Sequence, residues 1–143
     1  MRVTIGDLAI ALAVAGCDRR PPITSCDQDL TGEYAAGEQR WMVTDRGGQL
    51  DVFPLFPDVP ASVLEVAPRS IELARIGGTL RGHTRRRYMK GATSCIAKLP
   101  ATIARCADDT LEVVHAETAP PLAFEPCQWG RTEPARVDHW QRR

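Results

Sequence analysis

Short stretches in which apolar and polar residues alternate follow one another from Asp29 to the C-terminus, separated by Gly, Pro and Asp. Successive side chains of a strand point to opposite faces, so an alternation of period two predicts strands that bury one face. The clearest example runs from Arg40 to Phe53, where two alternating stretches flank the turn residues 45–48, DRGG. This arrangement predicts a β-hairpin.

Similar alternation predicts further strands along the rest of the chain. Gly77-Gly78 separates two of these stretches, which predicts a second hairpin, and Asp108-Asp109 predicts another turn. Pro100 lies inside one stretch and predicts an edge position, a bulge or a break, because proline cannot donate a hydrogen bond to a sheet. The stretches are residues 71–74, 79–88, 94–106, 110–116, 122–127 and 137–142.

Two other features complete the prediction of the fold. Residues 54–68 hold four prolines and predict a loop. No stretch of ten or more residues after the N-terminal segment shows a convincing period of 3.6, so we expect little helix. About eight short strands joined by tight turns predict an all-β domain, an antiparallel meander that forms either a barrel or a sandwich of two sheets.

The first sixteen residues have the order of a secretory signal peptide. Arg2 supplies an early positive charge, and an apolar run of nine residues follows from Leu8 to Gly16. Such a run is far shorter than the roughly 20 residues that cross a bilayer as a helix. We therefore expect export of the chain and no permanent transmembrane helix.

The segment Val14-Ala15-Gly16-Cys17 resembles a bacterial lipobox, in which signal peptidase cuts before a cysteine that carries a diacylglycerol. The resemblance implies removal of residues 1–16, lipid on Cys17, and a membrane-anchored protein on the periplasmic or cell-surface face. Residues 17–28 then form a tether, rich in charge and proline, before a β domain at 29–143. An ordinary signal peptide cut elsewhere, or no export, are the alternatives. Asp18 resembles an inner-membrane retention signal in enteric-type bacteria, but the choice of membrane stays open.

Charge argues against one class of partner. The chain holds 18 basic and 18 acidic residues, and removal of the leader, with Arg2 and Asp7, leaves 17 of each. Nucleic-acid-binding domains are usually strongly basic, so we expect no nucleic-acid partner.

Cysteine usage agrees with export. Apart from Cys17 there are four cysteines, separated by 69, 11 and 21 positions, with no C-x-x-C pair that would indicate zinc. We expect two disulfides. If residues 94–106 form one extended strand, Cys95 and Cys106 lie roughly 36 Å apart, too far for a bond. Cys106 and Cys127 are expected near one end of the meander, which favours the pairs Cys106–Cys127 and Cys26–Cys95 over the other connectivities.

The start of the β domain resembles two groups of proteins. Asp29-Leu30-Thr31-Gly32-Glu33-Tyr34 is similar to the opening strand of lipocalin-like barrels, where Gly-x-Trp closes one end; here Tyr34 replaces the tryptophan. Lipocalins place a basic residue of a late strand against that ring, which implies this role for Arg142 or Arg143, beside Trp140. Residues 26–32, with paired cysteines, also resemble uncharacterised small bacterial lipoproteins that begin Cys-x-x-Asp-Leu-Thr-Gly. That second resemblance implies no activity.

The sequence contains no motif that predicts an enzyme. The three histidines, His83, His115 and His139, lie far apart without a second metal ligand at a suitable spacing. No serine sits in a nucleophile elbow, and no glycine-rich phosphate loop precedes a helix. We therefore expect no catalytic residues, no metal and no cofactor.

The most unusual local feature is the basic segment 81–90, RGHTRRRYMK. In a strand, period two places Arg81, His83, Arg85 and Arg87 on one face. Such a row could contact anionic lipid, an acidic polymer of the cell surface or an acidic protein. Alternatively it is a solvated outer face that protects a sheet edge from pairing.

Two functions follow from these patterns. The domain is either a structural or interaction module whose interior is filled by side chains, or a lipocalin-like barrel that binds a small apolar or amphipathic ligand in its mouth. About 115 residues remain after the tether, so the strands are short and leave little room for a cavity. The length favours the interaction module.

Overall fold

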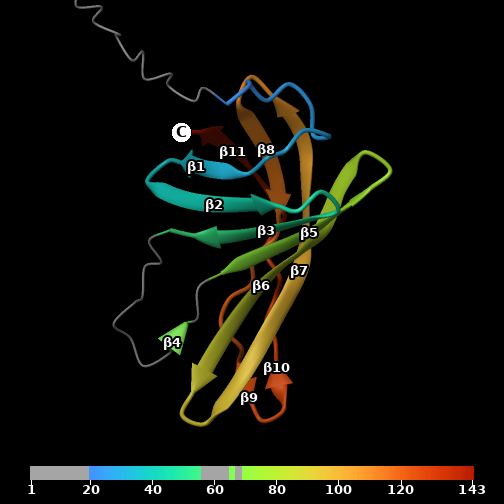
Figure 1. Cartoon of the computed structure of the whole chain (residues 1–143). Coiled ribbons are helices and arrows are strands. Elements are labelled where there is room, and N and C mark those ends of the chain that lie inside the picture. Colours follow the sequence, from blue (N-terminus) through green and yellow to red (C-terminus); the bar gives the residue numbers. More distant parts are fainter. Residues whose placement is uncertain (1–19, 56–64, 67–68) are drawn as a thin grey trace, which may run out of the picture.

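The computed structural model describes residues 20–55, 65–66 and 69–143. The predicted signal peptide, Cys17 and most of the predicted proline-rich loop lie outside these residues. Eight described strands form the body of the protein (Figure 1). They are β1 (Gly32–Ala36), β2 (Gln39–Asp45), β3 (Gln49–Pro54), β5 (Ser70–Ile76), β6 (Thr79–Lys90), β7 (Thr93–Ala107), β8 (Thr110–His115) and β11 (Arg136–Arg142).

These strands close into an antiparallel barrel. Each pairs with the next along the chain, and β11 pairs with both β8 and β1 to complete the circle. The prediction of an all-β meander is confirmed, and the architecture is a barrel rather than a sandwich. Three short strands lie outside the circle: β4 (Glu65–Val66), which pairs with β6, and the hairpin of β9 (Ala123–Phe124) and β10 (Cys127–Gln128).

The part of the chain that the structure describes contains no helix long and apolar enough to cross a membrane.

Local sequence explains the sharpest features of the barrel. The β5–β6 turn uses Gly77 and Gly78, whose φ angles of 56° and 77° are easily reached without a side chain. Asp108 and Asp109 adopt φ angles of 53° and 55° in the predicted β7–β8 turn. Within β6, a Cβ atom at Gly82 would collide with the backbone carbonyl of Glu72 on β5. Glycine is therefore required at this position of the β5–β6 pair.

The barrel interior is filled by large side chains. Trp41 of β2 and Trp140 of β11 stack with ring centroids 4.9 Å apart and planes 7° from parallel. Aliphatic side chains at alternate strand positions surround this pair, as period two predicts. The buried aliphatic members of the core are Ile23, Leu30, Val43, Leu50, Val52, Ile71, Leu73, Leu80, Ala101, Ile103, Leu111 and Val113.

The two ends of the barrel differ. At the tether end, where the chain enters, residues 20–28 cross the barrel opening and Ile23 is buried there (Figure 1). The Ile23 backbone N–H donates to Asp109 Oδ1 at 2.8 Å. Residues 20–28 of the predicted tether therefore pack with the domain, and residues 20–143 contain every described strand and both disulfides. At the distal end, β6 and β7 extend beyond the other strands toward β9 and β10.

The four cysteines form two disulfides, as expected, but the expected pairing is wrong. The bonds join Cys26 to Cys106 and Cys95 to Cys127, with Cα atoms 5.0 and 5.8 Å apart. Cys95 and Cys106 are indeed too far apart to pair, because both lie on β7, which has 15 residues. However, Cys106 lies at the tether end and Cys127 at the distal end, so each end of β7 is bonded to the segment beside it.

Pro100 neither ends nor shifts β7, which stays in register with β6 across it. Its carbonyl oxygen accepts from Ala116 N, just beyond the end of β8. The missing N–H of Pro100 faces the same side, where the pairing with β8 stops. The prediction of an edge position is therefore confirmed on that side of the strand.

A buried ion pair fixes the tether end. Asp45 accepts from Arg75 Nη2 at 2.7 Å and from the backbone N–H groups of Leu30 and Gly47 at 3.1 and 2.8 Å. Arg75 also donates to the carbonyl oxygen atoms of Cys26 and Gln28. This pair holds the segment before β1 against the β2–β3 turn and β5.

The Asp45 ion pair predicts a loss of stability in acid. Burial raises the pKa of Asp45, but the hydrogen bonds from Arg75, Leu30 and Gly47 outweigh it and hold the pKa below its usual value of 3.8. The unfolded chain therefore takes up this proton first, so the stabilisation is complete above about pH 4 and is lost as pH falls further. We expect Asp45→Asn to lower the free energy of unfolding by about 3 kcal/mol at pH 7, because Arg75 loses its buried partner.

Urea unfolding of the wild-type protein and the variant at pH 7 and pH 3 checks this prediction. The difference in the free energy of unfolding between the wild type and Asp45→Asn should be smaller at pH 3 than at pH 7. Glu38→Gln, at an exposed turn position, is the matched control and should behave as wild type. A difference that does not change with pH would contradict the role given to Asp45.

Candidate functional site

The β6–β7 hairpin separates charge unusually sharply. Residues 79–107 hold seven basic residues and no acidic residue, although the whole chain holds 18 of each. These two strands are also the longest of the described strands, with 12 and 15 residues. The basic residues are Arg81, Arg85, Arg86, Arg87, Lys90, Lys98 and Arg105.

Strand alternation sorts these side chains onto two faces. Leu80, Thr84 and Tyr88 of β6 are buried inside. Their neighbours of opposite parity therefore lie on the outer surface, together with Lys98 of β7, which is exposed. We call this surface the basic face; it consists of Arg81, His83, Arg85, Arg87 and Lys98.

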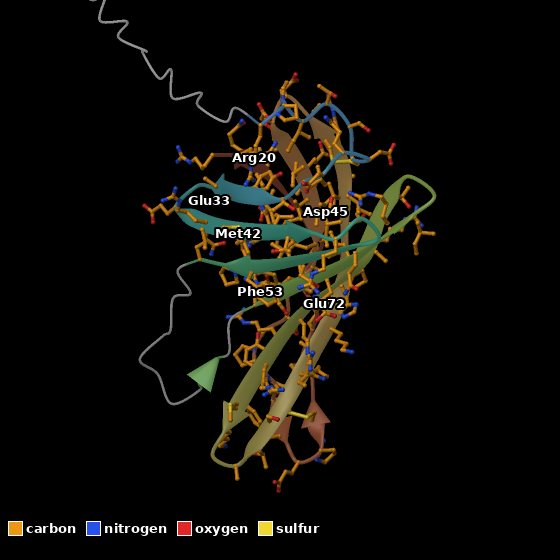
Figure 2. All side chains as sticks on the ribbon, viewed as in Figure 1. Arg20, Glu33, Met42, Asp45, Phe53 and Glu72 are labelled. Atoms are coloured by element: carbon orange, nitrogen blue, oxygen red, sulfur yellow. A yellow bond between two sulfur atoms is a disulfide. The ribbon has the colours of Figure 1, made fainter. Side chains whose placement is uncertain are left out.

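The basic face is electrostatically costly. Arg85 and Lys98 occupy directly opposite register positions on β6 and β7, where like charges destabilise a sheet. On β5, Glu72 (Figure 2) lies opposite His83, with Glu72 Oε2 and His83 Nε2 3.4 Å apart. No ion pair to an acidic residue is found for Arg81, Arg85, Arg87 or Lys98 within the described residues. The face thus presents excess positive charge to the surroundings.

Apolar groups lie among these cations. Ile96, opposite Arg87 on β7, is 37% exposed, and Pro100, opposite His83, is also exposed. The face is part of the outer wall of a barrel, so its backbone presents a regular pleated surface. Chemically, this surface can attract anions and pack lightly against apolar material.

A second charged group closes the distal end of the barrel. Glu117 contacts the guanidinium of Arg69 and lies 2.8 Å from Arg136 Nη2. His115, which is only 1% exposed, places Nε2 2.7 Å from Asp138 Oδ2. We call these five residues the distal cluster. It adjoins the core, since the Arg69 guanidinium lies 5.9 Å from the centre of the Trp41 ring.

The distal cluster has the chemistry of a structural plug. Burial lowers the pKa of Arg69; Glu117 counteracts this, while the positive charges of Arg86 and Arg136 add to it. Beside the cluster, Arg69, Thr84 and Glu117 help to line a cavity with a water-accessible volume of only about 10 Å³. Such a space holds about one water molecule, so it cannot admit an organic ligand.

The sequence alone did not predict the distal cluster. One pattern pointed to His115: it has the same parity along β8 as Leu111 and Val113, which indicates that its side chain points inward. The other members come from outside β8, and only barrel closure brings Arg69 and Glu117 together. The two remaining histidines lie elsewhere: His83 on the basic face and His139 at an outer hollow of about 150 Å³.

Removing the Glu117 carboxylate should destabilise the barrel. Glu117→Gln leaves the largely buried Arg69 without a full counter-charge, and we expect a loss of about 3 kcal/mol in the free energy of unfolding, measured with urea. Adding Arg69→Met removes the unpaired cation, so the double variant should recover part of the loss. Glu133→Gln, at an exposed position, is the control. A single variant as stable as this control would contradict the structural role.

The lipocalin-like start of the domain makes contacts at the tether end. Arg142, rather than the exposed Arg143, lies against Gly32 and opposite Tyr34, and donates to the Thr31 carbonyl at 2.9 Å. The buried Tyr34 hydroxyl donates to the Leu30 carbonyl at 2.8 Å, and burial raises the pKa of Tyr34. These contacts and the eight-stranded barrel are compatible with a lipocalin-like fold.

A search of family models, of curated proteins and of solved structures finds no match to this chain.

Proposed function

We propose that the protein is a membrane-anchored extracytoplasmic lipoprotein that acts as an interaction module, binding rather than catalysing. The observation that supports this most directly is the filled interior. Trp41 and Trp140 are 4% and 1% exposed and stack inside the barrel. Because side chains occupy the interior, contacts with a partner fall to the outer surface.

Both ends of the barrel support the same conclusion. Ile23 is buried where residues 20–28 cross the tether end. At the distal end, Arg69 and Glu117 meet beside Trp41. A ligand that entered from either end would have to displace a buried apolar side chain or break a largely desolvated ion pair, and both are costly.

The proposal of export and anchoring rests on the leader and on the cysteines. Two disulfides fit an oxidising compartment outside the cytoplasm. Arg20, which donates to the Thr31 carbonyl at 2.8 Å, is already held against the barrel. Only two residues separate it from Cys17, so a lipid there would hold the domain within roughly 11 Å of the bilayer.

A second candidate function is the binding of a small apolar or amphipathic ligand. The observation in its favour is that the indole Nε1 atoms of Trp41 and Trp140 are buried and have no hydrogen-bond partner among the described residues. An acceptor on a ligand would satisfy such a donor and relieve its desolvation cost. The filled interior makes this the weaker candidate.

Lipidation is tested by Cys17→Ser in the producing bacterium. The acyl group is attached to the cysteine thiol, so the substitution should abolish labelling by an alkyne palmitate and release the protein from membranes washed with 1 M salt, which screens contacts of the basic face. Cys26→Ser, which removes a half-cystine of the Cys26–Cys106 disulfide and leaves Cys17 in place, should keep the label. Unchanged labelling of the Cys17 variant would show that the leader is not a lipoprotein signal.

Native mass spectrometry of residues 18–143 separates the two candidate functions. A barrel filled by its own side chains should appear at the mass of the chain alone after gentle purification. A retained small molecule, lost when the protein is denatured, would favour ligand binding. The variant Trp140→Phe is informative in that case, since it removes one indole donor and should weaken retention.

A further inference from the structure

We propose that the basic face binds the anionic headgroups of the membrane that anchors the protein, so that the barrel lies with β6 and β7 against the bilayer. The inference rests on the proposed function for the anchor at Cys17. Beyond that proposal, the inference names a partner, the anionic headgroups, and the surface that contacts them, the basic face. The charge of the face, its shape and its place beside the tether support it.

Charge gives the attraction. Arg81, Arg85, Arg87 and Lys98 point outward without an acidic partner among the described residues, and Arg85 and Lys98 repel each other across the β6–β7 pair. An anionic surface relieves this repulsion and gains an attraction from each cation. Glu72, an acidic residue on the neighbouring strand β5, is already opposite His83.

Shape favours a lipid surface over a folded partner. Arg81 to Arg87 spans six positions of β6, roughly 20 Å along the strand at about 3.3 Å per residue. Headgroups form a continuous layer of charge, so they can meet such a row without any complementary groove. The exposed Ile96, beside Arg87, gives an apolar group that can enter the headgroup layer.

The position of β6 in the barrel brings the basic face close to the membrane anchor. β6 begins at Thr79, next to Gly78, and a Cβ atom at Gly78 would lie 3.9 Å from Asp27 in the segment 20–28 that crosses the barrel opening. The row therefore starts beside the anchored segment and runs away from it. A short anchor keeps this surface at high effective concentration near the bilayer, an advantage that a freely diffusing acidic protein lacks.

The tether end itself offers no comparable attraction. It carries the exposed carboxylates of Asp27, Asp29 and Asp108, and hydrogen bonds donated by Thr31 lower the pKa of Asp29, so that carboxylate stays ionised. Arg20, Arg105 and Arg142 lie at the same end and balance this negative charge. An upright domain would therefore gain little from an anionic membrane, whereas a domain on its side brings the basic face into contact.

Flotation of the unlipidated residues 18–143 with vesicles tests the inference independently of the lipid on Cys17. These residues include the complete described barrel and both disulfides. Binding is expected to vesicles of phosphatidylglycerol and phosphatidylcholine in equal parts at low salt. It should be lost at 1 M salt, where the Debye length is about 3 Å, and be absent with pure phosphatidylcholine.

The decisive variant replaces Arg81, Arg85 and Arg87 with glutamine. Each basic group near an anionic membrane contributes about a fivefold gain in binding, so we expect roughly 100-fold weaker binding. The matched control replaces Arg46, Arg131 and Arg143, three exposed arginines outside the basic face, with glutamine. Its net charge therefore equals that of the decisive variant. It should retain most of the wild-type binding. Circular dichroism and intact disulfides show that both variants are folded.

Three results would overturn the inference. The wild-type domain could ignore both anionic vesicles and a soluble acidic polymer at low salt, both triple variants could lose binding to the vesicles equally, or the domain could bind the polymer while it ignores the vesicles. The first two leave the basic face as a solvated wall, and the third makes its partner an acidic macromolecule. None of these results affects the palmitate labelling that tests the anchor, so failure of the inference and failure of the proposed function are distinguishable.

Discussion

The stacking of Trp41 on Trp140 inside the barrel is the interaction on which the rest of the structure depends. The two rings come from β2 and β11, on opposite sides of β1, so their contact joins strands from the two ends of the chain. An eight-stranded barrel has an interior just wide enough for side chains to fill. Once two indole rings occupy it, a cavity becomes small and the outer wall becomes the place for recognition.

The length of β7 is the second constraint. Its 15 residues run the whole length of the molecule, so one strand carries a half-cystine at each end. The Cys106 bond holds the entering chain over the barrel opening, while the Cys95 bond holds the β9–β10 hairpin against the extended part of β6 and β7. Covalent links therefore fix the two regions that have the fewest strands around them.

Local patterns in the sequence predicted the local structure, but they did not predict contacts between residues that lie far apart in the chain. Alternation around the turns at 45–48 and 77–78 was sufficient to place two hairpins, because register there follows from a tight turn. The partner of Cys106 was not predictable in this way, since it depends on which end of the barrel the tether segment covers. The same holds for Arg69 and Glu117, which meet only after β5 and β8 take their places in a closed circle. The outward row on β6 needed only strand parity, so the sequence indicated it directly.

The circular pairing has a consequence for the order in which the protein can fold. β11 follows the other described strands along the chain, yet it pairs with both β8 and β1. Until the seven residues Arg136–Arg142 join the sheet, it stays open, with β1 and β8 presenting unpaired edges that could join another chain. A chain that has formed the other strands is thus vulnerable to misassembly until β11 covers both of these edges.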